Sequence, residues 1–596
     1  MASAASFDGL ARASPESRGV KSADILAFLK EAKDLGVTFN SFMLYRRSAV
    51  ICEGWWYPYE PKLPHMTHSA TKSFTTVAVG LAIQEGYFSI TDRVLSFFPE
   101  QTPDEPSENL KAMTVEHLLT QTSGHTTSIS GGSWRGIKSS WIEEFFKVPV
   151  TRPPGTHFQY SSATSYMLSA MVQRTTGKSA LDFLLRRMLQ PMGIRDLRWQ
   201  VGPDGVNPGG NGISCHTSDL LKLAILFLNQ GKWEGRQLLA KEYALDACRP
   251  HFGNQYGYQW WIGEYPGSFY AYGLFGQFAI VIPEYDAILV TTASEPWGES
   301  VLRSLIWRRL PGIFDSTTPD VRSGSYELRS YLSELRVLPP FSPHTHTDHQ
   351  DLSDRLFVTE ANIDNIEAFT LDFEDDRAVV HIWDHRGIHR VDIGLKSWLT
   401  SETSVTCAPL HHGYEAETTM VVAGGRWSAP DVFEMTWQFP ETAFQDRVVI
   451  RVAGDAALFE RGVNVNSFAT QRPPIAARIL DKGTGCSAGL NVKKKVAKAL
   501  QLTDFSKMQL PARTVPFSVV GTSIGELLDR ADTRTVLQEV LPIDLLNHPR
   551  MQEARSYAPE RLSRTMASFS SFASLSDTEL QTIEARLKGV PLDTKR

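Results

Sequence analysis

Hydrophobic and polar positions alternate with two different periods along this chain, and the period predicts the local structure. Apolar residues recur every three to four positions at about 22–35 and over 69–86, where Gly86 provides a stop, so both segments are predicted helices. Residues 41–45 and 50–55 alternate instead and predict a hairpin around Arg46–Ala49.

Beyond residue 354 short alternating runs follow one another between turn signals, which predicts an antiparallel barrel or sandwich over 354–480. A small helical domain is predicted over 516–596, with Ser576–Glu579 as a capping box for its last helix. The Pro-, Ser- and Thr-rich segment 316–353 and the segment 481–515 are predicted linkers.

Length and composition fit a globular protein of several domains. The chain has 596 residues, a net charge of −6, 42% hydrophobic and 21% charged residues, which gives no indication of a nucleic-acid or membrane partner. Five scattered cysteines favour a reduced compartment. The start carries no secretory pattern and no apolar run approaches the ~20 residues of a membrane span, so we expect a cytoplasmic protein.

Candidate chemistry begins at Ser69-Ala-Thr-Lys72. A serine hydroxyl is a poor nucleophile unless a base lies beside it, and a helix places positions i and i+3 on one face. Lys72 would therefore lie next to the Ser69 oxygen. The alternative for this common tetrapeptide alone is a capping serine with an exposed lysine.

Two further sequence elements favour a catalytic Ser69–Lys72 pair over the capping alternative. A Pro154-Gly155 turn leads to Tyr160-Ser-Ser162 and a predicted helix. Later, Tyr270-Ala-Tyr-Gly-Leu-Phe-Gly-Gln277 leads into predicted strands at 278–282 and 287–292.

With these three elements in this order, residues of about 10–315 resemble the serine β-lactamase-related superfamily, which includes class C β-lactamases, family VIII esterases and 6-aminohexanoate-dimer hydrolases. The resemblance implies an α/β (α+β) domain over 1–315 with a mostly antiparallel sheet flanked by helices. Some relatives carry a lipocalin-like or β-barrel appendage, and the module at 354–480 looks similar. Such an appendage either borders the active site or only stabilises the protein.

The resemblance also implies a role for each matching position. Ser69 would be the acylated nucleophile, Lys72 its proton acceptor, and Tyr160 the proton shuttle for the leaving group and the water. The oxyanion hole would consist of the backbone amides of Ser69 and Leu274. For Lys72 or Tyr160 to act near pH 7, its pKa must be lowered. The expected substrate contacts are Ser162, Tyr272, Gly273 and Gln277.

The chain departs from the family pattern at two places. Ser162 stands where asparagine is usual, and Ala271 where a lysine or histidine opens the third motif. Without that cation, recognition of a substrate carboxylate is not expected. Aromatic residues near the motifs favour an uncharged acyl group, as in esterases and amidases.

No metal or cofactor is predicted. His344-Thr-His-Thr-Asp-His349 reads as a solvated loop, and His381, His385 and His389 would not converge on strands. His68, beside the nucleophile, is expected to pack or to wall the substrate site.

We therefore expect a metal-independent serine hydrolase that cleaves a small-molecule ester or amide through an acyl-enzyme. An acyltransferase with the same residues and a catalytically silent binding protein of the same fold remain alternatives. The helical tail is expected to dock on a neighbouring domain or to mediate self-association, which leaves a homo-oligomer open.

Overall fold

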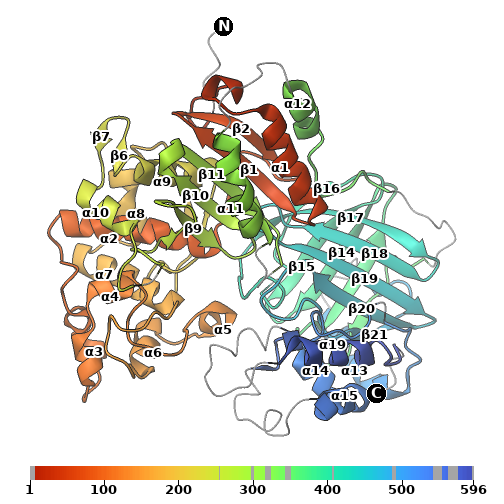
Figure 1. Ribbon diagram of the computed structural model, residues 1–596. Coiled ribbons are helices and arrows are strands. Elements are labelled where there is room, and N and C mark those ends of the chain that lie inside the picture. The colour runs from red at the N-terminus through yellow and green to blue at the C-terminus, as the bar shows by residue number, and fades with distance from the viewer. Residues whose placement is uncertain are drawn as a thin grey trace. The chain divides into compact units, whose positions relative to one another are not determined.

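The computed structural model describes residues 7–253, 255–296, 301–315, 324–342, 351–405, 408–485, 492–513, 515–540, 554–560 and 575–592. They form two compact units, Met1–Val337 with Glu441–Ala443 and Leu338–Pro440 with Phe444–Arg596 (Figure 1). The first unit contains the three candidate motifs.

A six-stranded antiparallel sheet organises the first unit. Its strand order is β2-β1-β11-β10-β9-β8. The predicted hairpin is confirmed, because Arg46 pairs with Ala49 across a turn in which Arg47 and Ser48 have positive φ. The strands are β1 (Phe39–Arg46), β2 (Ala49–Trp55), β8 (Trp261–Ile262), β9 (Phe269–Gly273), β10 (Gln277–Ile282) and β11 (Ala287–Ala293).

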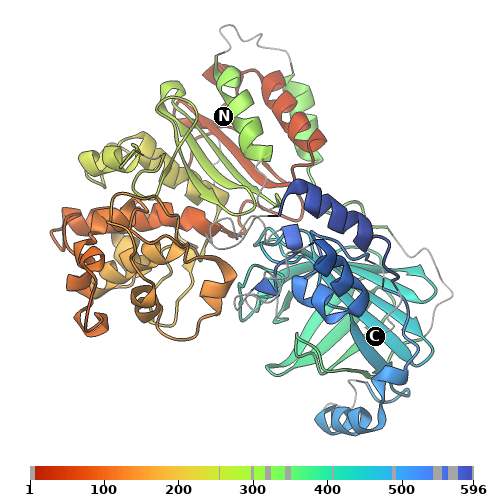
Figure 2. The same cartoon turned by 60° about the horizontal axis from the view of Figure 1, so that its bottom comes forward.

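Helices cover both faces of this sheet. Successive side chains of a strand point to opposite faces, so alternate residues of β1 pack against different groups of helices. Phe42 and Leu44 pack in the cluster formed with α1 (Ser22–Asp34) and α11 (Val301–Phe314). Met43 and Tyr45 pack with α2 (Lys72–Gln84), α7 (Ser162–Thr176) and α9 (Thr217–Leu228). Figure 2 shows the sheet between these two groups. The fold class predicted for the first part of the chain is confirmed.

Short elements complete the first unit. They are η1 (Glu16–Arg18), β3 (His65–Met66), η2 (His68–Thr71), η3 (Val94–Phe97), η4 (Pro99–Gln101), α3 (Glu108–Ala112), α4 (Val115–Leu119), α5 (Gly131–Gly136), α6 (Trp141–Lys147), α8 (Ala180–Leu184), η5 (Leu185–Leu189), β4 (Arg198–Trp199), β5 (Ile213–Cys215), β6 (Lys232–Trp233), β7 (Arg236–Gln237), α10 (Lys241–Ala247) and η6 (Pro283–Tyr285).

The second unit contains a closed nine-stranded barrel, which resolves the sequence alternative between barrel and sandwich. The ring closes where Gly394 of β15 pairs with Gly424 of β17, and β16 lies outside it on β17. The strands are β12 (Phe357–Thr359), β13 (Ala368–Phe373), β14 (Arg377–Asp384), β15 (Gly387–Gly394), β16 (Leu399–Thr403), β17 (Thr419–Ala429), β18 (Val432–Gln438), β19 (Gln445–Ala453), β20 (Ala456–Val463) and β21 (Ile475–Ile479).

The predicted helical tail is confirmed and has a small core of its own, in which Phe517, Leu537 and Ile583 are buried. The capping box of its last helix is also present. The elements after the barrel are α13 (Val492–Leu502), η8 (Phe505–Lys507), α14 (Ile524–Asp529), α15 (Ala531–Val540) and α19 (Asp577–Leu587).

Both segments predicted as linkers contain a helix. Within 316–353, α12 (Ser325–Ser333) packs beside α1 through buried Leu328. Within 481–515, α13 packs Val496 and Ala499 against the barrel. Each helix lies within or beside sequence rich in Pro, Ser, Thr or Lys, which led to the linker predictions.

The described residues include no helix that is both long and apolar enough to cross a membrane. They also include no group of three or more His, Cys, Asp or Glu side chains arranged to hold a metal. His389 instead contacts Asp384 and Ser404 at 2.8 and 2.9 Å. His344–His349 lies outside the described residues.

Candidate active site

The first motif lies at the junction of a short turn and a buried helix. Ser69 belongs to the 3-10 turn η2, and Lys72 is the first residue of α2. The predicted helix over 69–86 therefore begins as a tighter turn and ends at Gln84. The i, i+3 relation is nevertheless kept, and Lys72 Nζ lies 3.1 Å from Ser69 Oγ.

Lys72 is held by three oxygen atoms in a buried position. Its Nζ donates to Ser69 Oγ, to Ser162 Oγ at 3.1 Å and to Gly210 O at 2.8 Å. The residue is only 2% exposed. Burial, assisted by the charge of Arg135, lowers the pKa of Lys72 to about 7. A lysine in this environment can exchange a proton near neutral pH.

Tyr160 lies over the same ammonium group. Lys72 Nζ is 4.7 Å from the centroid of its ring, which stacks on Trp261 at 5.4 Å. Burial raises the pKa of Tyr160, although a hydrogen bond with Ser69 opposes the rise. Of the two residues expected to titrate near pH 7, the lysine alone has a lowered pKa.

The chain around the second motif is fixed by hydrogen bonds from distant residues. Gln121 Oε1 accepts from Ser161 N at 2.8 Å, and Ser130 Oγ accepts from Ser162 N at 2.7 Å. Ser128 Oγ donates to Tyr160 O at 2.7 Å. These contacts hold the segment from which both the Tyr160 ring and the Ser162 hydroxyl reach Lys72 Nζ.

The third motif passes very close to the nucleophile. A Cβ on Gly273 would lie 2.0 Å from Thr67 O, so a side chain at this position would collide with the turn that carries Ser69. Leu274 follows at the end of β9. The two residues predicted to form the oxyanion hole therefore belong to chain segments in close contact.

Gln277 and Tyr272 occupy different environments. Gln277 is 0% exposed, and its Nε2 donates to Leu274 O and Ala293 O at 2.8 and 2.9 Å. Its side chain thus braces the turn at Leu274. Tyr272 is half-buried and stacks on Phe278 at 4.9 Å.

Sequence reasoning missed two contributors to this site. Gly210 supplies the carbonyl for Lys72, and a Cβ on it would lie 2.7 Å from Ser162 O. The Pro208-Gly-Gly run was the available signal. Arg135 of α5 carries no such signal, yet its charge lowers the pKa of both Lys72 and His68.

His68 is buried beside Phe275, with ring centroids 5.2 Å apart in an edge-to-face arrangement. Burial, with smaller effects from Arg135 and His65, lowers its pKa well below the usual range. A neutral packing residue agrees with the expectation from sequence.

Comparison with known proteins identifies similar chains. Residues 31–306 match the family model described as Beta-lactamase. A lovastatin esterase of Penicillium rubens is 31% identical over 22% of this chain and 37% of its own length. The 6-aminohexanoate-dimer hydrolase of Paenarthrobacter ureafaciens is 24% identical over 43% of this chain and 73% of its own.

Among solved structures, EstCE1, a hydrolase with promiscuous acyltransferase activity, is 16% identical and has a TM-score of 0.41. The match covers 49% of this chain and 97% of that one.

Proposed function

The chain carries a Beta-lactamase-family domain over residues 31–306, and on this premise we propose that it is a serine hydrolase that cleaves an ester or amide through an acyl-enzyme at Ser69. The observation that carries the proposal is the contact of 3.1 Å between Lys72 Nζ and Ser69 Oγ, made by a lysine whose pKa is lowered to about 7.

In the first step Lys72 acts as the base. Its neutral amine takes the proton of Ser69 as Oγ forms a bond to the substrate carbonyl carbon. The buried position favours the neutral amine, and the three oxygens around Nζ hold its ammonium form once the proton has moved.

The negative charge that develops on the carbonyl oxygen would be held by the backbone amides of Ser69 and Leu274. Preorganised donors of this kind are worth about 3 kcal/mol each. Gly273 permits the close approach of the two segments, and Gln277 braces the turn, so we assign Gln277 a positioning role in place of substrate contact.

Tyr160 would act as the acid. Because its pKa is raised, it enters the reaction as a phenol and donates its proton to the leaving group as the carbon–leaving-group bond breaks. The proton on Lys72 then restores the phenol. In the second step water attacks the acyl carbon, its proton passes through the same pair, and Ser69 Oγ leaves protonated.

The third motif supports an uncharged substrate at the strand edge. Ala271 and Tyr272 stand where a cation and a small hydroxyl residue are usual. Ser162, with its Oγ already in contact with Lys72, offers a shorter reach to a substrate amide than asparagine. We therefore place simple esters and uncharged amides before carboxylate-bearing substrates.

The test is turnover of p-nitrophenyl acetate and butyrate by the full chain. We expect Ser69→Ala to lower kcat/KM by more than about 10³-fold. The control is Ser96→Ala, because Ser96 is an exposed serine of the same unit and should leave the rate unchanged. Full activity in Ser69→Ala, or inactivity of the folded parent chain toward both esters and the matching p-nitroanilides, would contradict the proposal.

A further inference from the structure

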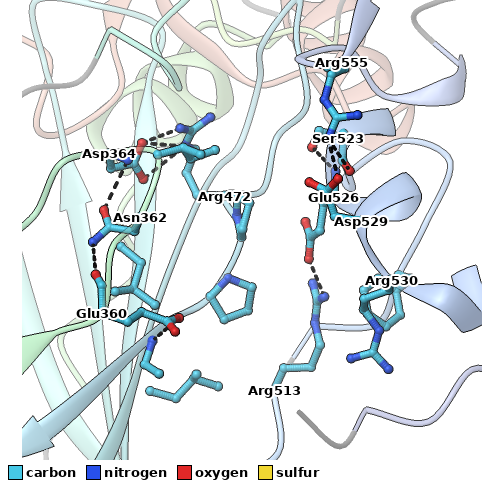
Figure 3. A pocket seen from close by; sticks show the side chains of 18 of the residues that line it. Glu360, Asn362, Asp364, Arg472, Arg513, Ser523, Glu526, Asp529, Arg530 and Arg555 are labelled. Carbon is cyan, nitrogen blue, oxygen red and sulfur yellow. Dashed lines mark hydrogen bonds and ion pairs between the residues drawn. The ribbon is translucent and has the colours of Figure 1, made fainter. Parts of the chain in front are cut away.

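The second unit contains a pocket of about 990 Å³ beside α14 (Figure 3). Charged side chains of its lining pair with one another, as in Arg472–Asp364 and Arg530–Asp532. Because such paired charges neutralise each other, the lining favours no class of ligand. The side chains around Tyr160 in the first unit are more specific.

A cluster of aromatic side chains surrounds the ring of Tyr160. The ring of Trp261, in β8, lies within 26° of parallel to it, with centroids 5.4 Å apart. Tyr256 meets both rings edge-on, with its centroid 4.8 Å from Trp261 and 6.2 Å from Tyr160. Phe158 also packs on Trp261, at 5.9 Å. Aromatic pairs are stabilised by stacked and edge-to-face arrangements, so these contacts restrict the tilt of the Tyr160 ring.

The position of Trp261 is set by the sheet. Trp261 pairs with Tyr270 of β9 in the antiparallel ladder, and their rings lie within 18° of parallel. The strand β9 continues to Gly273, where it passes against the turn η2. One pair of strands therefore fixes both the strand end beside the nucleophile and the ring on which Tyr160 stacks.

Proton transfer requires the phenol of Tyr160 to stay within reach of its partners. Its hydroxyl shares a hydrogen bond with Ser69, and Lys72 Nζ lies 4.7 Å from the centroid of its ring. A tilt of the ring would move the hydroxyl away from the nucleophile and from the departing atom of a substrate. Misplacement of a reacting group by about 1 Å can lower a rate by about 10²-fold.

We infer that Trp261 is a positioning residue that holds Tyr160 in its proton-donating orientation, and that the substrates are esters or amides whose leaving groups need that proton. This assignment rests on the proposed role of Tyr160 as the acid. Unprotonated alkoxides and amide anions depart far less readily than p-nitrophenolate. The orientation of Tyr160 therefore matters most for unactivated esters and amides.

The test compares ethyl butyrate with p-nitrophenyl butyrate, which give the same acyl-enzyme but differ in the leaving group. The measured quantity is kcat/KM, which reports on acylation, the step in which the leaving group departs. In full-length Trp261→Leu we expect kcat/KM to fall about 10²-fold for ethyl butyrate and less than about tenfold for p-nitrophenyl butyrate. Trp261→Phe keeps an aromatic ring beside Tyr160 and should recover most of the rate with ethyl butyrate.

The matched control is Trp233→Leu, because Trp233 is a half-buried tryptophan of the separate β6–β7 hairpin. It should leave the ratio of the two kcat/KM values unchanged. Equal losses for the two esters in Trp261→Leu, or no loss for either, would overturn the positioning role.

Tyr160→Phe distinguishes this outcome from a failure of the proposed function. It removes the acid itself, so it should favour the activated ester over ethyl butyrate even more strongly than Trp261→Leu does. Equal losses for both esters in Tyr160→Phe would refute Tyr160 as the acid, and the assignment of Trp261 with it.

Discussion

At the scale of single residues, the account depends on the protonation of Lys72. Burial and Arg135 lower its pKa to about 7, below the ordinary value of 10.5. In the proposed mechanism the neutral amine of Lys72 is the base, and this form predominates only above that pKa. We therefore expect kcat/KM to rise with pH through an inflection near 7 and then level off, as measured with p-nitrophenyl butyrate between pH 5 and 9. A rate independent of pH across this range would remove Lys72 as the base.

Arg135 permits a second prediction at this scale. Its positive charge disfavours the ammonium form of Lys72, so Arg135→Gln should raise the pKa of Lys72. The rising limb of the pH profile should then move to higher pH while the plateau rate changes less. Arg186→Gln, at an exposed arginine of the same unit, should leave the profile in place. An unmoved profile in Arg135→Gln would show that its charge does not reach the lysine.

These residues also mark what sequence could predict. Ser69 and Lys72 are three positions apart, so local helix geometry alone brings them together. Gly210 and Arg135 reach the same lysine from 138 and 63 positions away, and only the tertiary fold decides that approach. Gln277 was predicted as a substrate contact from its place in the motif. That place could not reveal that its side-chain amide donates hydrogen bonds to Leu274 O and Ala293 O.

At the scale of elements, the end of β9 passes directly against η2, the turn that carries Ser69. Strand alternation and the hairpin signals predicted β1, β2, β10 and β11 of the first unit and the antiparallel strands of 354–480 as a group, since buried strands carry a clear apolar pattern. The helices α12 and α13 were missed, because the Pro-, Ser-, Thr- and Lys-rich sequence in and around them was read as linker.

The close approach of β9 gives a prediction. Gly273→Ala would place a Cβ 2.0 Å from Thr67 O and push the Leu274 amide away from Ser69. We expect about a 10²-fold loss of kcat, the typical effect of losing one oxyanion donor. Gly312→Ala is the matched control, because Gly312 is an exposed position of α11 with open space around it. Equal kcat values for the two variants would argue against Leu274 as a donor.

At the scale of the whole molecule, the chain consists of two units with separate cores. The second unit relies on a buried charge network in which Asp446 contacts His411 Nε2 at 2.8 Å and Arg461 Nη2 at 2.6 Å. Burial would raise the pKa of Asp446, but the charges of Arg461 and His411 outweigh it and the pKa is lowered.

Removing this carboxylate tests the division into units. Asp446→Asn leaves Arg461 uncompensated, so we expect a loss of about 3–5 kcal/mol of stability in the second unit. Esterase activity should persist at urea concentrations where the barrel has unfolded, when barrel structure and activity are followed in parallel. Asp455→Asn, in an exposed pair, should change stability by less than about 1 kcal/mol. Joint loss of barrel structure and activity would contradict independent units.

The most direct test of the central claim is mass spectrometry of the protein quenched during p-nitrophenyl butyrate turnover. We predict a butyryl adduct on the peptide that contains Ser69, present in the parent chain and absent from Ser69→Ala. An adduct that forms on another residue and is turned over at the catalytic rate would contradict the acyl-enzyme at Ser69.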